Sequence, residues 1–201
     1  MPSAQAVKKT AEERQNARVS TTDPEARVMK MGDGGFRPAY NIHLATDTPS
    51  LVVTGVTVTH RGADSDEASP MLKQVEETSE KQPKDYLTDG GIATRNEVEK
   101  FAAAGVTLYS PTRTSRDKGR EQTEPLPTDS PAVAAWRVRM GTDEGKATYR
   151  QRAATSEYVN AQLRTREGLY QFVVRGLAKV TSVVLWMVIT HNILRWIALR
   201  T

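Results

Sequence analysis

The sequence predicts an α/β fold with a long helical region at its C-terminal end. Two segments of alternating apolar and polar residues flank a short turn between residues 40 and 60. A strand, helix, strand order follows over residues 85–109, which is typical of parallel neighbours in an α/β sheet. Beyond residue 131, apolar residues recur mainly at helical spacing. We therefore expect a mixed sheet flanked by helices.

Residues 40–60 predict a β-hairpin. Tyr40 to Thr46 alternates, and Leu51 to His60 is rich in Val and Thr with a period of two. Between them, Asp47-Thr48-Pro49-Ser50 has the composition of a turn. The following helix is expected to begin near Asp64-Ser65-Asp66-Glu67 and to stop at Gln82-Pro83.

Glycines and prolines mark the ends of the next elements. We expect a strand over Asp85–Thr88, a helix over Thr94–Ala104 that Gly105 closes, and a strand over Val106–Tyr109. Residues 112–130 predict a surface loop or small insertion. Helices are then expected over residues 132–140, 144–164 and 168–199, the first opened by Pro131.

Composition limits the chemistry. The 201-residue chain has no cysteine, which excludes disulfides, thiolate zinc sites and cysteine nucleophiles, and favours a cytoplasmic protein. Its N-terminus lacks the pattern of a signal peptide. The net charge of +4 is unevenly distributed, because residues 137–201 carry 11 Lys or Arg against 4 Asp or Glu. This basic half is either a phosphate-contacting surface or a solvated surface without a partner.

Asp89 is the first candidate site residue. It ends a predicted strand and precedes Gly90 and Gly91, which allow a tight turn and a close backbone approach. Ligands of open α/β sheets bind at this edge of the strands. The alternative is an ordinary turn residue.

The second candidate lies on the predicted helix over residues 144–164. Arg150, Glu157 and Arg164 are spaced by seven residues and fall on nearly the same face. A carboxylate flanked by guanidinium groups can hold a cation while its neighbours contact phosphate oxygens. The alternative is an exposed helix face held by salt bridges.

Five ordered motifs resemble the DDE transposases of bacterial insertion sequences, over about residues 19–199. They are Thr22-Asp23-Pro24-Glu25-Ala26-Arg27, Tyr40-Asn41, Asp85-Tyr86-Leu87-Thr88-Asp89-Gly90-Gly91, Ala103-Ala104-Gly105-Val106 and the segment from Tyr149-Arg150 to Glu157. The family's C-terminal Ala-His-Asn-Leu type motif has a counterpart in Thr190-His191-Asn192-Ile193. The resemblance implies a ribonuclease-H-like fold.

The resemblance also implies a chemistry and its residues. Asp89 would be the second catalytic aspartate and Glu157 the closing glutamate, both as metal ligands. Tyr149, Arg150, Arg152 and Arg164 would contact DNA. The expected cofactor is Mg²⁺ or Mn²⁺, in a two-ion site formed only by a complete domain, because paired hard cations clamp both reacting oxygens of a phosphodiester. The reaction would be DNA cleavage at the element ends followed by strand transfer to target DNA.

The sequence departs from the family at the first catalytic aspartate. No residue before Thr21 offers an Asp-Gly strand, and Asp23 and Asp47 are weak substitutes in a linker motif and a hairpin turn. We therefore expect residues 1–22 to be a disordered or loosely helical arm. Residues 23–201 would form a partial catalytic domain whose first, central strand is missing, with residues 144–199 as its helical C-terminal part.

Three functions follow from this interpretation. The first is DNA transposition, with this chain a truncated and inactive form. The second is a non-catalytic DNA-binding or regulatory fragment that associates with itself or with full-length transposase. The third is a tail-anchored membrane protein, which we disfavour because residues 180–194 are too short and too polar for a span. The expected partners are therefore element-end and target DNA, with no membrane.

Overall fold

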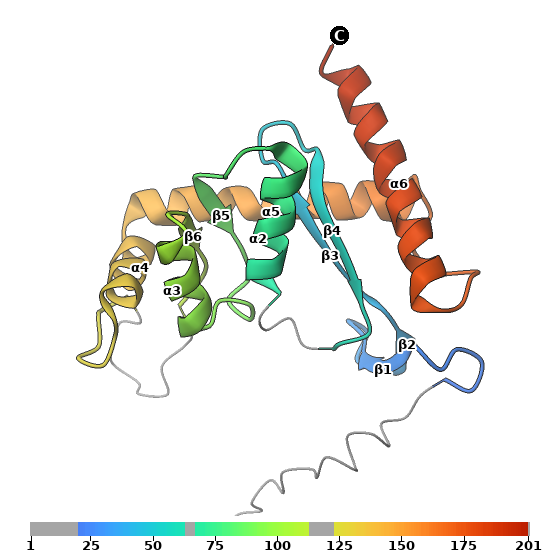
Figure 1. The fold of residues 1–201 in the computed structure, drawn as a ribbon, viewed down its shortest axis with the longest axis horizontal. Helices are drawn as coiled ribbons and strands as arrows, with labels where there is room; N and C mark the ends of the chain where they lie inside the picture. The colour runs from blue at the N-terminus through green and yellow to red at the C-terminus, as the bar shows by residue number, and fades with distance from the viewer. Residues whose placement is uncertain (1–19, 63–66, 113–122, 201) are drawn as a thin grey trace, which may run out of the picture.

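The computed structural model describes residues 20–62, 67–112 and 123–200 of the chain. Its order of strands and helices confirms an α/β fold. In Figure 1, α5 runs behind two pairs of strands, and α6 lies at the opposite side of the molecule from α3 and α4. The predicted N-terminal arm lies almost wholly outside the described residues, as does half of the predicted loop over residues 112–130.

The first two strands form a hairpin that the sequence did not predict. Strands β1 (Arg27–Lys30) and β2 (Phe36–Ala39) pair antiparallel. Their turn depends on Gly34, whose φ of +82° favours glycine, and on Asp33, whose carboxylate accepts a hydrogen bond from the Gly35 amide. β2 is largely exposed and β1 is only partly buried, so the two strands lack the apolar alternation that would have indicated them.

The second hairpin confirms the prediction. Strands β3 (Asn41–Thr46) and β4 (Val53–Thr59) pair antiparallel, with a register shift at Ala45 and Thr46. Helix α2 (Ala68–Ser79) follows and packs on β4.

The strand, helix, strand unit is also confirmed. Strands β5 (Asp85–Leu87) and β6 (Thr107–Tyr109) pair parallel, and α3 (Arg95–Ala103) connects them. The side chain of Thr94 caps α3 by accepting a hydrogen bond from the Glu97 amide at 3.2 Å. Gly105, with φ of +75°, reverses the chain after the helix.

Three helices complete the fold: α4 (Pro131–Gly141), α5 (Asp143–Thr165) and α6 (Leu177–Ala198). The first two agree with prediction. The last begins nine residues later than expected, because Gly168 and Gly176 both have left-handed φ values, +75° and +87°, and residues 168–176 form an irregular connection.

The strands do not form the single mixed sheet that was expected. In the described residues they form three separate two-stranded sheets, and no ladder joins β3 to β5. Side chains cover the outer edges of two of these pairs. Arg139 and Trp136 donate hydrogen bonds to the carbonyls of Leu108 and Ser110, beside β6. Asn192 and Gln74 bind the backbone of Val53 and Val56 in β4.

Two hydrophobic clusters form the core. The first joins α2, α3, β6 and α4 around Phe101, Leu108 and Trp136. The second joins the β3–β4 hairpin to α5 and α6 around Leu163 and Val184. Helix α5 contributes to both, so it connects the two halves of the molecule.

Candidate functional site

The loops that follow β5 and β6 lie against each other at the carboxyl end of the parallel pair. A Cβ atom added to Gly90 would lie 3.2 Å from the Pro111 carbonyl oxygen, so glycine is needed for this approach. The Asp89 carbonyl accepts hydrogen bonds from the amides of Ile92 and Ala93, which turn the chain into α3. This turn leaves the Asp89 side chain 59% exposed at the edge of the sheet.

Three of the predicted site residues meet at this edge. The Arg152 guanidinium, on α5, donates a hydrogen bond to the Asp89 carboxylate at 2.6 Å. Arg152 also hydrogen-bonds the side chain of Tyr149, one turn earlier on the same helix. Burial raises the pKa of the Tyr149 phenol, and the neighbouring Asp89 carboxylate adds to this effect while Arg152 opposes it. Asp89, Tyr149 and Arg152 therefore form one polar cluster.

The other predicted site residues lie elsewhere on α5. The side of α5 that packs on the molecule carries Thr155, Val159 and Leu163, which are all buried. Arg150, Glu157 and Arg164 are exposed and, at 100° per residue, lie on the opposite side of the helix. Their predicted common face is confirmed. The alternative of an exposed face also expects this position, and in the described residues no ion pair joins the three side chains.

The structure does not bring Asp89 and Glu157 into a metal site. No group of three or more His, Asp or Glu side chains among the described residues could hold a metal ion. Asp89 is paired with Arg152, and Glu157 lies on the side of α5 away from that pair. The residues present therefore do not fit a two-ion centre by themselves.

Asp23 and Asp47 do not replace the expected first aspartate. Asp23 is 9% exposed, and its carboxylate accepts hydrogen bonds from the Tyr40 hydroxyl at 2.8 Å and from the amides of Gly176 and Glu25. Burial raises the pKa of Asp23, but these hydrogen bonds outweigh it and hold the pKa below its usual value. Asp47 accepts hydrogen bonds from the amide and hydroxyl of Ser50 within the hairpin turn.

The Thr-Asp-Pro-Glu motif holds the start of α6. Asp23 binds the Gly176 amide at 3.2 Å, and Glu25 binds the Leu177 amide at 2.8 Å. These are amides of the helix N-terminus, which lack partners within the helix and favour carboxylates. Burial and the hydrogen bond to Asp23 raise the pKa of Tyr40 to about 12. Sequence reasoning missed this function, because the motif and the helix lie about 150 residues apart.

The Thr190-His191-Asn192-Ile193 motif fixes the middle of α6 to the hairpin. Asn192 accepts a hydrogen bond from the Val53 amide at 2.9 Å and donates one to the Val53 carbonyl at 2.8 Å. His191 Nε2 lies 2.9 Å from the Leu51 carbonyl oxygen, and Arg195 Nε donates to the Ser50 carbonyl at 3.0 Å. The motif therefore docks a helix on backbone groups and contributes nothing to the Asp89 cluster.

The length of α6 corrects the expectation that this segment is too short for a membrane span. The helix has 22 residues, and an 18-residue window within it has a mean hydropathy of 1.5 with only 22% of the window buried. By length and composition alone, this helix could cross a membrane.

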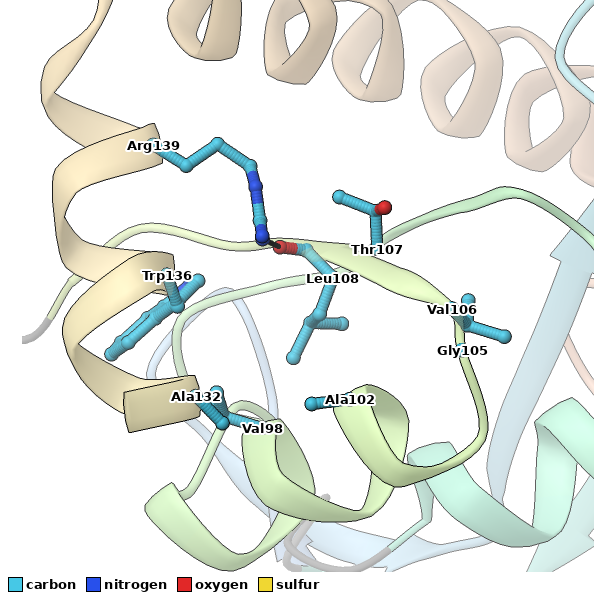
Figure 2. Close-up of a pocket in the computed structure, with 9 residues that line it drawn as sticks. All are labelled: Val98, Ala102, Gly105, Val106, Thr107, Leu108, Ala132, Trp136 and Arg139. Carbon is cyan, nitrogen blue, oxygen red and sulfur yellow. Dashed lines mark hydrogen bonds between the residues drawn. The ribbon is translucent and has the colours of Figure 1, made fainter. Parts of the chain in front are cut away.

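A hollow of about 200 Å³ lies between α3, β6 and α4, away from Asp89. Figure 2 shows Arg139 reaching across it to the Leu108 carbonyl, above the side chains of Val98 and Ala102. Its lining is mainly aliphatic, with Trp136 on the α4 side. None of the predicted site residues lines it, so it plays no part in the candidate site.

The comparison with protein families matches residues 112–197 to the transposase DDE domain. The match covers less than half of the chain, and it makes residues 112–197 similar to the C-terminal part of a DDE transposase domain. Neither a curated protein nor a solved structure shows significant similarity to the chain. DDE transposases act in DNA transposition by nucleotidyl transfer, bind DNA and generally use divalent metal ions.

The matched range contains Tyr149, Arg150, Arg152, Glu157 and Arg164, together with almost all of α6. Asp89 lies before it, so this comparison does not test the predicted role of Asp89. Helix α5 thus carries the Asp89 cluster at one side and the exposed side chains of Arg150, Glu157 and Arg164 on the other.

Proposed function

We propose that the chain acts in DNA transposition by binding DNA on the exposed side of α5. The observation that carries this proposal is the position of Arg150 and Arg164. Both are exposed on α5, within the range similar to a transposase DDE domain, each about two turns from Glu157 and about four turns from the other. Neither forms an ion pair with an acidic side chain in the described parts of the chain. Two guanidinium groups about 21 Å apart along a helix axis can contact separate phosphates of one duplex.

The charge distribution supports the same surface. Residues 137–201 carry 11 Lys or Arg against 4 Asp or Glu, whereas the chain as a whole has a net charge of only +4. A basic half on an otherwise acidic chain attracts nucleic acid over the range of a Debye length. Lys146 is exposed one turn before Arg150 on the same side of α5 and extends the positive surface.

The test is a salt titration of duplex binding by fluorescence anisotropy, using DNA that carries the ends of an insertion sequence. Each phosphate contact contributes about −0.9 to the slope of log K against log salt concentration, so Arg150→Ala with Arg164→Ala should reduce the slope by roughly two units. The matched control is Arg61→Ala with Lys73→Ala, which removes two exposed cations outside α5. Equal losses in both double variants would contradict the proposed surface.

We also propose that cleavage and strand transfer require a further carboxylate, on a strand that pairs with β3 or β5. The outer edges of β4 and β6 are covered by side chains, whereas β3 and β5 each have one strand neighbour among the described residues. Helix α5 contacts both β3 and β6, so it already underlies both pairs. A strand in this position would give one ribonuclease-H-like sheet with Asp89 near its centre.

This proposal predicts that the chain alone leaves DNA intact. Incubation of supercoiled plasmid carrying element ends with Mg²⁺ or Mn²⁺ should give no nicked product above background. Nicking that disappears in both Asp89→Ala and Glu157→Gln would contradict the proposal, because it would make these two carboxylates sufficient. Gln151→Ala, an exposed substitution on the same helix, is the control for non-specific loss of activity.

A second function is favoured by the same combination of an exposed basic helix and an incomplete set of carboxylates. The chain would occupy element ends without cutting them and so inhibit a complete transposase of the same element. Adding the chain to such an enzyme should slow cleavage in proportion to its concentration. Arg150→Ala with Arg164→Ala should relieve the inhibition, whereas inhibition that survives this change would require a protein contact instead of DNA.

A further inference from the structure

One face of α6 is apolar and exposed although the opposite face is packed. The side chains of Val180, Val184, Val188 and His191 are buried against the hairpin and α5. On the other side lies a line of four residues, which we call the α6 seam: Trp186 (70% exposed), Ile189 (47%), Ile193 (52%) and Trp196 (56%). Leu185 and Ile197 flank it and are also exposed. Monomeric proteins rarely leave so large an apolar surface uncovered.

The spacing of the seam favours a second helix as the covering partner. Its residues recur at intervals of three, four and three, which is the 3.5-residue period that keeps a seam facing a partner helix. No charged side chain lies within the seam. A bilayer does not select this period.

The packed face argues against a membrane-spanning α6. Asn192, His191 and Arg195 hold the helix to the backbone of residues 50–53 through four hydrogen bonds. Insertion into a bilayer would break these bonds and leave the polar groups unpaired in hydrocarbon, at a cost of several kcal/mol for each group. Helix α6 is therefore available to a partner on one side only.

The order of residues in the seam identifies the partner. The seam has the sequence Trp, Ile, Ile, Trp and is symmetric about position 191. We propose that the α6 seams of two copies of this chain pack antiparallel around that position. Each Trp186 then meets the other copy's Trp196, and each Ile189 meets the other copy's Ile193, as a two-fold interface requires. Figure 1 shows α6 at the edge of the molecule with its C-terminal turns extending beyond the strands, so a second copy can approach it.

The charges at the helix ends do not choose between the two directions. In the antiparallel pair Arg200, whose guanidinium lies 4.4 Å from the Trp196 ring centroid, would lie beside Ser182 and one turn from Lys179 of the second copy, whereas in a parallel pair Lys179 and Arg200 would each meet their own copies. The macrodipoles of the two helices oppose each other favourably in the antiparallel arrangement.

The first test is the mass of the full chain in solution by sedimentation equilibrium without detergent. The wild type should be a dimer at micromolar concentrations, and Trp186→Glu with Trp196→Glu should be a monomer with an unchanged far-ultraviolet circular dichroism spectrum. Val138→Glu is the matched control, since this apolar residue is 52% exposed on α4, at the opposite side of the molecule from α6, and it should remain a dimer. A monomeric wild type at 50 µM, or a dimer that survives the double substitution, would overturn the proposal.

The second test uses the absence of native cysteine. Chains with Trp186→Cys and with Trp196→Cys, carrying tags of different mass, should form a mixed disulfide when combined under mild oxidation. Each chain alone should cross-link far more slowly, because antiparallel packing separates identical positions by about 15 Å along the helix. Equally fast cross-linking of each chain alone would overturn the antiparallel arrangement.

The cysteine variants remain informative if the glutamate variants fail to fold. Flotation with phosphatidylcholine and phosphatidylglycerol vesicles tests whether a lipid surface, instead of a second copy of the chain, covers the seam. If the wild type floats and the double glutamate variant does not, and no mixed disulfide forms, a lipid surface covers the seam and the proposal is wrong.

Discussion

The Glu97 carboxylate is fully buried between two helices and binds both. It accepts hydrogen bonds from the amide and hydroxyl of Ser69 at the start of α2, and from the Lys100 ammonium on its own helix at 2.8 Å. Glu67, at the N-cap position of α2, provides no side-chain cap. Glu97 therefore caps α2 from a neighbouring helix.

The stabilisation that Glu97 provides decreases at low pH. Burial raises the pKa of Glu97, but the hydrogen bonds from Lys100 and Ser69 and the charge of Lys100 outweigh it, so the pKa lies below its usual value of 4.5. The stabilisation is therefore fully present above about pH 4.5 and is lost as the pH falls through the lower folded-state pKa. Lowering the pH should weaken the contact between α2 and α3.

We predict that Glu97→Gln lowers the free energy of unfolding by about 2 kcal/mol at pH 7, since hydrogen bonds to a charged group are lost. The difference from wild type should shrink as the pH falls below about 4.5. Urea denaturation at several pH values measures both effects. Glu99→Gln, exposed on the same helix, is the control and should change the free energy of unfolding little at any pH. A difference between wild type and Glu97→Gln that stays constant down to pH 3 would contradict this role of Glu97.

At the same scale, the sequence predicted some site residues and not others. Asp89 and Arg152 were identified because each lies in a local motif, and the structure brings them within 2.6 Å. The roles of Asp23, Glu25 and Asn192 could not be predicted, because each binds backbone groups about 140–150 residues away. Backbone amides and carbonyls have no sequence signature, so long-range caps of this kind escape a local pattern.

At the scale of the element, α6 begins where one glycine allows it. Gly176 has φ of +87° and ψ of 141°, a conformation that is essentially restricted to glycine. Its amide faces Asp23, and a Cβ atom at this position would lie 2.9 Å from the Glu25 carboxylate. The start of the helix thus depends on the absence of a side chain.

We predict that Gly176→Ala destabilises the protein by about 1–3 kcal/mol, through backbone strain and displacement of Glu25. Thermal unfolding followed by circular dichroism should show the loss as a lower melting temperature. Gly91→Ala is the control, since it has neither a positive φ nor a neighbouring atom within 4 Å of the added Cβ, and it should be close to neutral. Similar losses in the two variants would show that Gly176 has no special role.

Elements with strong periodicity could be predicted, and exposed ones could not. The β3–β4 hairpin and helices α3, α4 and α5 agree with their apolar spacing and their flanking Gly, Pro and Thr residues. The β1–β2 hairpin was missed because its strands bury little. Residues 168–176 were wrongly included in α6, since Phe172 and Val174 extend the apolar pattern without forming a helix.

At the scale of the whole molecule, α5 connects two hydrophobic cores. Tyr149 packs against the first core, and Val159 and Leu163 belong to the second, where Leu163 is 1% exposed. The sequence could not predict this division, because it depends on which strands pair and which do not. Each half can therefore open locally with its own free energy.

We predict that Leu163→Ala destabilises the second core by about 3 kcal/mol, as expected for a buried leucine that leaves a cavity. Hydrogen exchange should then accelerate mainly in α6 and the β3–β4 hairpin. Phe101→Ala, in the first core, should give the opposite pattern, with faster exchange in α3, β5 and β6. Uniform acceleration in both variants would instead indicate a single cooperative unit.

The positions of the three tryptophans give the molecule an internal optical probe. Trp136 is 4% exposed and donates its indole N–H to the Ser110 carbonyl at 3.1 Å, so acrylamide cannot reach it in the folded state. Trp186 and Trp196 are 70% and 56% exposed in the single chain, so they should emit at longer wavelengths in a monomer and be shielded from acrylamide in the proposed dimer. Fluorescence quenching therefore separates events in the first core from events on α6, without any label added to the chain.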